Sequence, residues 1–310
     1  MRQRRWFALV LGLVLATVTS NVALATGAWS QAQRVQDLPG TDPAFNTDGF
    51  LDGCPFIAPD GKMLFMASTR PGGLGGIDIW VSTRASKSDP WGPASNVGAP
   101  INSEQNDFCP TLALDGHTFM FVSNRPGFCG SVANADIYIS QLKSKKALLA
   151  GGVAFEEVRH LKCDTEGGAN SAFDEASPFP QLDLAQGIVL YFSSTRSGNG
   201  DIYVSKLGRD GFQAAQQVPG LNTDAVEGQP NVRADGREIF FFSNRTPALG
   251  NDIYSATRRS FWSSWGTPVN LGDAVNSSAS ETRPSLSLDG RTLYFGSTRT
   301  GAGDIYVTTR

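Results

Sequence analysis

The sequence predicts an all-β fold: a five-bladed β-propeller closed by an N-terminal strand that joins the last blade. A tripeptide of aspartate, isoleucine and an aromatic residue recurs five times, at intervals of 51 to 65 residues. A repeat period above about 40 residues that is filled with short strands is typical of propellers. The last repeat also stops after its third strand, while an unassigned strand lies near the N-terminus. The tripeptides are Asp78-Ile79-Trp80, Asp136-Ile137-Tyr138, Asp201-Ile202-Tyr203, Asp252-Ile253-Tyr254 and Asp304-Ile305-Tyr306.

Composition agrees with a single all-β domain. The 310 residues include 34 Gly, 17 Pro and 19 Phe, and only 18% are charged. Short apolar runs between turn-forming residues are typical of strands joined by tight loops. A chain of this length buries enough surface to fold without disulfides or metals. We therefore expect one propeller domain over residues 26–310.

Residues 1–25 have the pattern of a secretory signal peptide. A segment with three arginines precedes the apolar stretch Trp6–Val18, and Ala23-Leu24-Ala25 follows as a small-x-small cleavage site. We expect a periplasmic or secreted protein with no membrane span after cleavage, and an uncleaved anchor is the alternative. Without the three arginines the net charge is about −6. An acidic chain without a basic cluster argues against nucleic acid as a partner.

The first repeat shows the order of elements in a blade. Pro55–Ala58 is a short strand, followed by a turn at Asp60-Gly61 where glycine supplies the positive φ. Met63–Ala67 is a second, buried strand that ends in a Ser-x-Arg sequence and a glycine-rich loop. Asp78–Thr83 is the third strand, and Trp91 starts a fourth, outer strand.

The other repeats follow the same order. In each one a proline opens the first strand, at Pro55, Pro110, Pro178, Pro230 and Pro284. We place the blades at about 50–100, 105–165, 173–220, 225–272 and 279–310.

The two ends of the chain predict how the ring closes. Trp29 has the position in its segment that Trp91 and Trp265 have in theirs. A closing strand over 29–38 would complete the fifth blade and leave no open edge between the first and last blades.

These features resemble the TolB-type β-propeller repeat, a WD40-like repeat of bacterial envelope proteins. The similarity is carried by Ser-x-Arg, the glycine-rich loop, Asp-Ile-Tyr, the outer Trp and the Pro-Asp-Gly-Lys turn, over about residues 29–310. The resemblance implies a propeller fold. It implies no single role, because the family includes scaffolds, periplasmic binding partners and accessory domains of enzymes.

An acidic residue stands three positions before each strand-opening proline. Five-fold symmetry would place these acids around one end of the central channel, which we call the top; it carries the loops between the second and third strands. Each acid has a possible partner in the Ser-x-Arg arginine of its own blade, and a carboxylate beside an arginine stays ionised and structural. The expected ion pairs are Asp52–Arg70, Asp107–Arg125, Glu175–Arg196, Glu227–Arg245 and Glu281–Arg299.

The alternative is that the channel acids carry chemistry. Glycoside hydrolases use pairs of carboxylates as acid and base or nucleophile. In this interpretation Asp52, Asp107 and Glu227 are the catalytic residues of a glycan-active hydrolase, and at least one channel acid lacks an arginine. The sequence has no zinc-ligand spacing and no EF-hand loop, so we expect no metal and no cofactor.

The repeats differ most in their top loops. From the Ser-x-Arg arginine to the tripeptide aspartate the intervals are 8, 11, 5, 7 and 5 residues in blades 1 to 5. Binding residues concentrate on loops held by a rigid scaffold. We therefore expect a ligand at the top of blades 1 and 2, contacting Asp52, Leu74, Asp107 and Phe128. The alternative is that the longer loops are tolerated insertions.

All four cysteines lie in blades 1 and 2, and an even number in an exported chain permits two disulfides. Cys129 in a top loop and Cys163 after the outer strand of the same blade predict one disulfide. Cys54 and Cys109 hold equivalent positions in adjacent blades and predict a second. Other pairings stay open, because sequence does not determine connectivity.

The main functional hypothesis is a non-enzymatic, exported and monomeric propeller that binds a protein, peptide or glycan of the bacterial envelope. Glycan hydrolysis by the channel carboxylates is the alternative.

Overall fold

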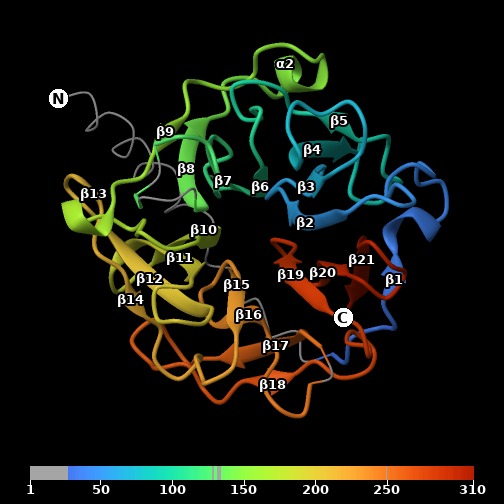
Figure 1. Cartoon of the computed structure of the whole chain (residues 1–310). Coiled ribbons are helices and arrows are strands. Elements are labelled where there is room, and N and C mark those ends of the chain that lie inside the picture. The colour runs from blue at the N-terminus through green and yellow to red at the C-terminus, as the bar shows by residue number, and fades with distance from the viewer. Residues whose placement is uncertain (1–26, 128, 131–133, 249) are drawn as a thin grey trace.

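The computed structural model describes residues 27–127, 129–130, 134–248 and 250–310. The predicted signal peptide and Phe128 lie outside these residues. Five antiparallel sheets surround a central axis (Figure 1). The predicted five-bladed propeller is therefore confirmed. In the described part of the chain, no helix is both long enough and apolar enough to cross a membrane.

Each blade runs outwards from the axis in chain order, with its first strand innermost. The blades consist, in order, of β2 (Asp52–Ile57), β3 (Met63–Ser68), β4 (Asp78–Thr83) and β5 (Ser95–Asn96); β6 (Asp107–Leu112), β7 (Thr118–Ser123), β8 (Asp136–Gln141) and β9 (Arg159–His160); β10 (Glu175–Asp183), β11 (Gly187–Ser194), β12 (Asp201–Gly208), β13 (Gly211–Phe212) and β14 (Gln216–Gln217); β15 (Glu227–Val232), β16 (Glu238–Ser243), β17 (Asp252–Thr257) and β18 (Val269–Asn270); and β19 (Glu281–Leu286), β20 (Thr292–Ser297) and β21 (Asp304–Thr309) with β1 (Gln33–Arg34). The described helical segments are short: η1 (Val35–Asp37), α2 (Lys145–Leu149) and η2 (Asp164–Glu166).

The N-terminal segment closes the ring, as the sequence predicts. β1 pairs antiparallel with β21 as the outer strand of the fifth blade. The ring of Trp29 packs edge-on against Phe240 and lies 4.6 Å below the guanidinium of Arg310. The closing strand is shorter than the expected 29–38, because the chain turns into η1 directly after Arg34.

The other two outer tryptophans also stack against an arginine. Trp91 lies 4.3 Å from the guanidinium of Arg84, and Trp265 lies 4.4 Å from that of Arg258. Each arginine directly follows the third strand of its blade. The repeated stacking supports the equivalence of the three tryptophans that the sequence suggested.

The core consists of aromatic and aliphatic side chains between neighbouring blades. All six residues of β3 are buried. The ring of Phe65 in blade 1 lies 5.2 Å from Phe119 in blade 2, which in turn packs on Phe155. A strand buried on both faces has no solvent side, and this explains why second strands are continuous apolar runs.

An asparagine, buried in four of the five cases, joins each blade to the next. Asn102 accepts a hydrogen bond from the backbone N–H of Ile79 and donates one to its carbonyl, both at 2.9 Å. The side chain thus extends the ladder of the third strand into the loop that enters the following blade. The same bidentate contact joins Asn46 to Ile305, Asn170 to Ile137, Asn222 to Ile202 and Asn276 to Ile253.

The first strands begin differently from the prediction. Each starts at the acidic residue, and the proline lies inside the strand rather than opening it. One extra residue between Gly53 and Phe56 opposes β3, which makes a β-bulge, and the other four blades have the same irregularity. The bulge accommodates a proline without a ladder N–H, so pairing continues on both sides of it.

We expect Asn102→Ala to lower the free energy of unfolding by roughly 2–4 kcal/mol, because it leaves two buried backbone groups of Ile79 without partners. Chemical denaturation measures the change, with the exposed Gln105→Ala as control. Equal stability of the two variants would contradict the role given to Asn102.

Candidate functional site

The five predicted acid–arginine contacts are present at the top of the inner strands. The carboxylate side chains are fully buried. The arginine nitrogen lies 2.6 Å from the carboxylate oxygen in Asp52–Arg70 and Asp107–Arg125, 2.9 Å in Glu175–Arg196 and Glu281–Arg299, and 3.1 Å in Glu227–Arg245.

Each carboxylate also holds the loop that enters its blade. Oδ2 of Asp107 accepts hydrogen bonds from the backbone N–H and the hydroxyl of Ser103, both at 2.7 Å. Glu281 makes the same two contacts with Ser277 and accepts a third from the hydroxyl of Ser297. The arginines bind backbone carbonyls of the same loops, as Arg125 does at Pro100 and Ile101.

These contacts occupy the groups that the sequence offered for catalysis. Asp52, Asp107 and Glu227, the residues of the hydrolase alternative, each lie beside an arginine and have no exposed side-chain surface. A general acid or base must reach the substrate within hydrogen-bonding distance. In this geometry the acids fix loops and carry charge pairs. Burial raises the pKa of Glu175, because it outweighs the hydrogen bonds of this carboxylate and the charge of Arg196.

The ligand surface expected at the top of blades 1 and 2 is only partly assembled. Leu74 is 53% exposed on its loop. Asp52 and Asp107 face inwards into their ion pairs, so they present no oxygen to a ligand in solvent. Asp78 holds this loop, because its Oδ2 accepts hydrogen bonds from the N–H groups of Leu74 and Gly75. Its Oδ1 has no hydrogen-bond partner among the residues that the structure describes.

The disulfide predicted between Cys129 and Cys163 is confirmed, with an S–S distance of 2.07 Å. His160 lies beside it, and its Nε2 is 2.8 Å from the carboxylate of Asp136. Bonded sulfurs are not thiolate ligands, so this cluster does not form a metal site.

The second predicted disulfide is wrong for this structure. Cys54 and Cys109 are free, and their sulfurs are 3.3 Å apart, well beyond the S–S bond length of about 2.05 Å. They lie at the bulges of β2 and β6, on adjacent inner strands. The prediction that the two cysteines hold equivalent positions is correct. Their sulfurs are in contact across the two blades but are not bonded.

The bulges create a group of channel residues that the sequence analysis did not single out. One residue of every bulge has a positive φ, between 47° and 58°, although none of the five is glycine. Such conformations are strained in non-glycine residues and persist where the surroundings impose them. We call this set the channel ring: Cys54, Cys109, Ser177, Gln229 and Arg283. In the sequence, each residue of the channel ring directly precedes the proline of its inner strand. That position could have identified the ring.

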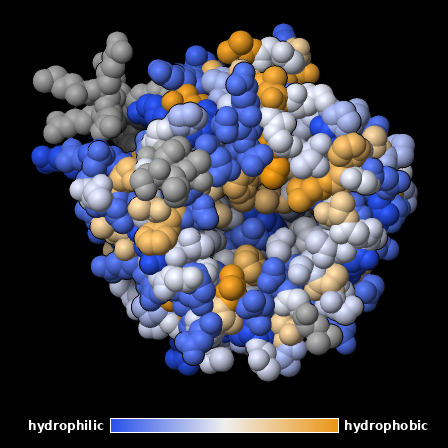
Figure 2. Space-filling view, viewed as in Figure 1, coloured by the Kyte–Doolittle hydropathy of each residue, from blue (hydrophilic) through white to orange (hydrophobic). Residues whose placement is uncertain are grey.

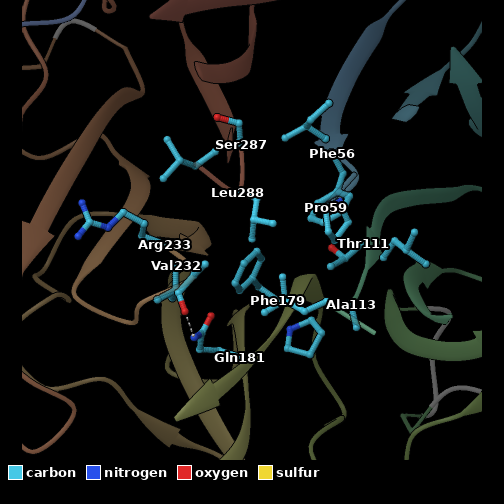
Figure 3. Close-up of a pocket in the computed structure, with 16 residues that line it drawn as sticks. Phe56, Pro59, Thr111, Ala113, Phe179, Gln181, Val232, Arg233, Ser287 and Leu288 are labelled. Atoms are coloured by element: carbon cyan, nitrogen blue, oxygen red, sulfur yellow. Dashed lines mark hydrogen bonds between the residues drawn. The ribbon is translucent and has the colours of Figure 1, made fainter. Parts of the chain in front are cut away.

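A concave pocket lies at the other end of the channel, where the inner strands end. We call it the hollow; residues from all five blades line it. Phe179 lies near its centre, with Phe56 and Pro59 on one side and Val232 on the other (Figure 3). Gln181 and Ser287 place an amide and a hydroxyl at its edge. The space-filling view shows the opposite, top end of the axis, where the molecule is also recessed at its centre (Figure 2).

Three ion pairs missed by the sequence analysis connect the strand ends on this side. Asp183 of blade 3 is 3.1 Å from Arg258 of blade 4. Glu238 of blade 4 binds Arg310 of blade 5 at 2.6 Å and lies 3.5 Å from Arg233. These residues do not recur in every repeat, so periodicity could not reveal them.

No family model and no curated protein sequence matches this chain. Among solved structures, an endo-arabinase from Bacteroides thetaiotaomicron VPI-5482 is 16% identical with a TM-score of 0.56, over 92% of this chain and 98% of that one. A family 117 glycoside hydrolase from Zobellia galactanivorans is 12% identical with a TM-score of 0.52, over 91% and 90%. A putative TolB from Agrobacterium tumefaciens is 17% identical with a TM-score of 0.48, over 81% and 71%.

These likenesses show the fold. They do not single out the TolB-type family that the sequence resembles.

We expect Asp107→Ala to lower the free energy of unfolding by roughly 3–5 kcal/mol, because it leaves Arg125 with an uncompensated charge in a poorly solvated place. Thermal or chemical denaturation measures this, with the exposed neighbour Glu104→Ala as control. A loss no larger than that of the control would show that the pair does not hold the blade.

Asp78 and Asp60 should change stability with pH in opposite directions. Burial raises the pKa of Asp78, against the hydrogen bonds of Gly75 and Leu74. The folded state therefore binds the proton more tightly, and stability falls as pH rises from about 3.8 through the folded pKa. Burial by itself would raise the pKa of Asp60 as well. The hydrogen bond and the charge of Lys145 act against burial, and the pKa of Asp60 is lowered. Asp60 therefore contributes stability that is fully present above its unfolded pKa and is lost as pH falls through its folded pKa.

For each of Asp78→Asn and Asp60→Asn, the unfolding free energy of wild type is subtracted from that of the variant. The two differences should diverge between about pH 3 and pH 7. The difference should rise with pH for Asp78→Asn and fall for Asp60→Asn. Parallel curves would contradict these directions.

Proposed function

We propose that this chain is an exported propeller that binds a glycan in the hollow without cleaving it. The observation that carries the proposal is the hollow itself, a concave apolar surface with a central phenylalanine and a few polar groups at its edge. Ligand sites are typically concave and mostly apolar, with a small number of polar groups that set orientation. The C–H face of a sugar ring packs on such a surface while its hydroxyls meet the polar edge.

The fold comparisons support glycan over protein or peptide as the ligand class. The endo-arabinase and the family 117 glycoside hydrolase, both matched over nearly their whole length, are named for activity on glycosides. Their identity to this chain is low, so they support the class of ligand only as a proposal. The disulfide between Cys129 and Cys163 supports export, since disulfides persist in oxidising compartments.

Glycan hydrolysis is the second candidate, and the same comparisons favour it. Burial raises the pKa of Glu175, as suits a general acid. Against it, the five carboxylates lie in contact with arginines and are fully buried, whereas hydrolysis needs two carboxyl groups facing one glycosidic bond. We therefore rank binding without cleavage first.

We expect Phe179→Ala to weaken binding of arabinan-derived oligosaccharides about tenfold, through loss of the apolar platform. Isothermal titration measures the affinity. Phe173→Ala, which removes a phenylalanine that is 51% exposed and does not line the hollow, is the matched control. Phe179→Leu keeps apolar bulk and tests whether the ring itself is needed. Equal affinity of wild type and Phe179→Ala, with both folded, would contradict the site.

Release of reducing ends from the same glycans separates the two candidates. Binding without cleavage predicts none above a blank. Release by wild type that is abolished in Glu227→Gln or Glu175→Gln, with each variant still folded, would replace the binding proposal by the hydrolase.

A further inference from the structure

The channel ring brings two thiols and a buried arginine together. Cys54 comes from β2, Cys109 from β6 and Arg283 from β19, and these three inner strands are neighbours around the axis. The two sulfurs are 3.3 Å apart, and the hydroxyl of Ser177 lies 3.7 Å from Cys109 Sγ. Gln229 completes the ring by accepting a hydrogen bond from the backbone N–H of Arg283.

Arg283 differs from the other buried arginines in its partners. Arg70 and Arg258, which are similarly buried, each bind a carboxylate. Arg283 is 7% exposed, and neither its Nε nor its Nη2 has a hydrogen-bond partner among the described residues. No described carboxylate lies within ion-pair distance of it. A buried charge without a carboxylate partner is costly, and Cys54, the more exposed of the two thiols, can supply a compensating anion beside Arg283.

The two thiols have unequal environments. Cys54 is partly exposed, whereas Cys109 is 1% exposed. The hydrogen bond from Cys109 and the charge of Arg283 lower the pKa of Cys54 to about 6, although burial acts in the opposite direction. Burial raises the pKa of Cys109 well above its ordinary value. A partly exposed thiolate beside a protonated, buried thiol is the arrangement of a nucleophilic and a resolving cysteine.

We propose that Cys54 and Cys109 form a redox-active dithiol in the channel, in which Cys54 is the nucleophilic thiolate, Arg283 is its counter-ion and the substrate is a low-molecular-weight disulfide. Cys54 Sγ⁻ attacks one sulfur of the substrate R–S–S–R, forms a mixed disulfide and expels R–S⁻. Cys109 then loses its proton to solvent and attacks Cys54 Sγ, which expels the second R–S⁻. The chain gains one disulfide, and the substrate is reduced to two thiols.

The geometry suits the second step. The sulfurs need to approach each other by little more than about 1 Å to reach bonding distance. The resulting bond would join the inner strands of blades 1 and 2. This site is separate from the hollow, so the proposal does not depend on glycan binding.

The test uses the full mature chain and an aromatic disulfide that releases a coloured thiol. Mass spectrometry of the intact protein then detects any adduct. In wild type both thiol equivalents should be released while no adduct remains, because Cys109 resolves the mixed disulfide. Cys109→Ser should release one equivalent and keep one adduct. Cys54→Ser should react at least about tenfold more slowly, because Cys109 is buried and protonated. Stable adducts on wild type, or equal rates for the two serine variants, would overturn the proposal.

Arg283→Gln tests the counter-ion. It should slow the reaction of Cys54 at about pH 7 roughly tenfold and shift the rate–pH curve to higher pH, while Arg283→Lys restores both. Arg291→Gln, an exposed arginine of the same blade, is the matched control. An unchanged curve for Arg283→Gln in a folded protein would remove Arg283 from the mechanism.

Equilibration in glutathione buffers of graded ratio, with alkylation and peptide mapping, completes the test. The Cys54–Cys109 pair should convert between dithiol and disulfide across the series while Cys129–Cys163 stays oxidised. Cys54 and Cys109 that remain oxidised, or remain reduced, at every ratio would overturn the proposal.

Discussion

A buried carboxylate at the start of each inner strand holds the propeller together. It neutralises the arginine that ends the second strand, and in four of the blades it also binds the N–H and hydroxyl of a serine or threonine in the loop from the preceding blade. The nearby asparagine then fastens that loop to the preceding blade. Together these groups satisfy the polar backbone where the chain passes between sheets, a place where unpaired groups would be costly.

The same contacts limit what the acids can do. A carboxylate that accepts hydrogen bonds from an arginine, a hydroxyl and a backbone N–H has little capacity left for a substrate. In both of our proposals the groups that act therefore lie outside the repeated acid–arginine pairs. Two sets remain in one channel: the apolar hollow at the ends of the inner strands, and the strained polar ring near their beginnings.

The channel ring shows how a repeated backbone feature carries different chemistry in each blade. The bulge places one side chain per blade in the left-handed region. The five positions hold two thiols, a hydroxyl, an amide and a guanidinium, so the symmetry of the backbone is absent from the side chains. A cation next to two thiols arises because blades 1, 2 and 5 meet at the axis, and that contact exists only once the ring is closed.

The amino-acid sequence alone predicts the number of blades, the closure by the N-terminal strand, the five acid–arginine pairs and the disulfide between Cys129 and Cys163. These follow from periodicity and from contacts within one blade or between consecutive elements. The three-dimensional fold adds that the inner prolines lie in bulges, that Cys54 and Cys109 are unbonded in this structure, and that Arg283 lies beside them from a strand more than 150 residues away in the chain. These contacts depend on the spacing of the inner strands around the axis, which no single repeat encodes.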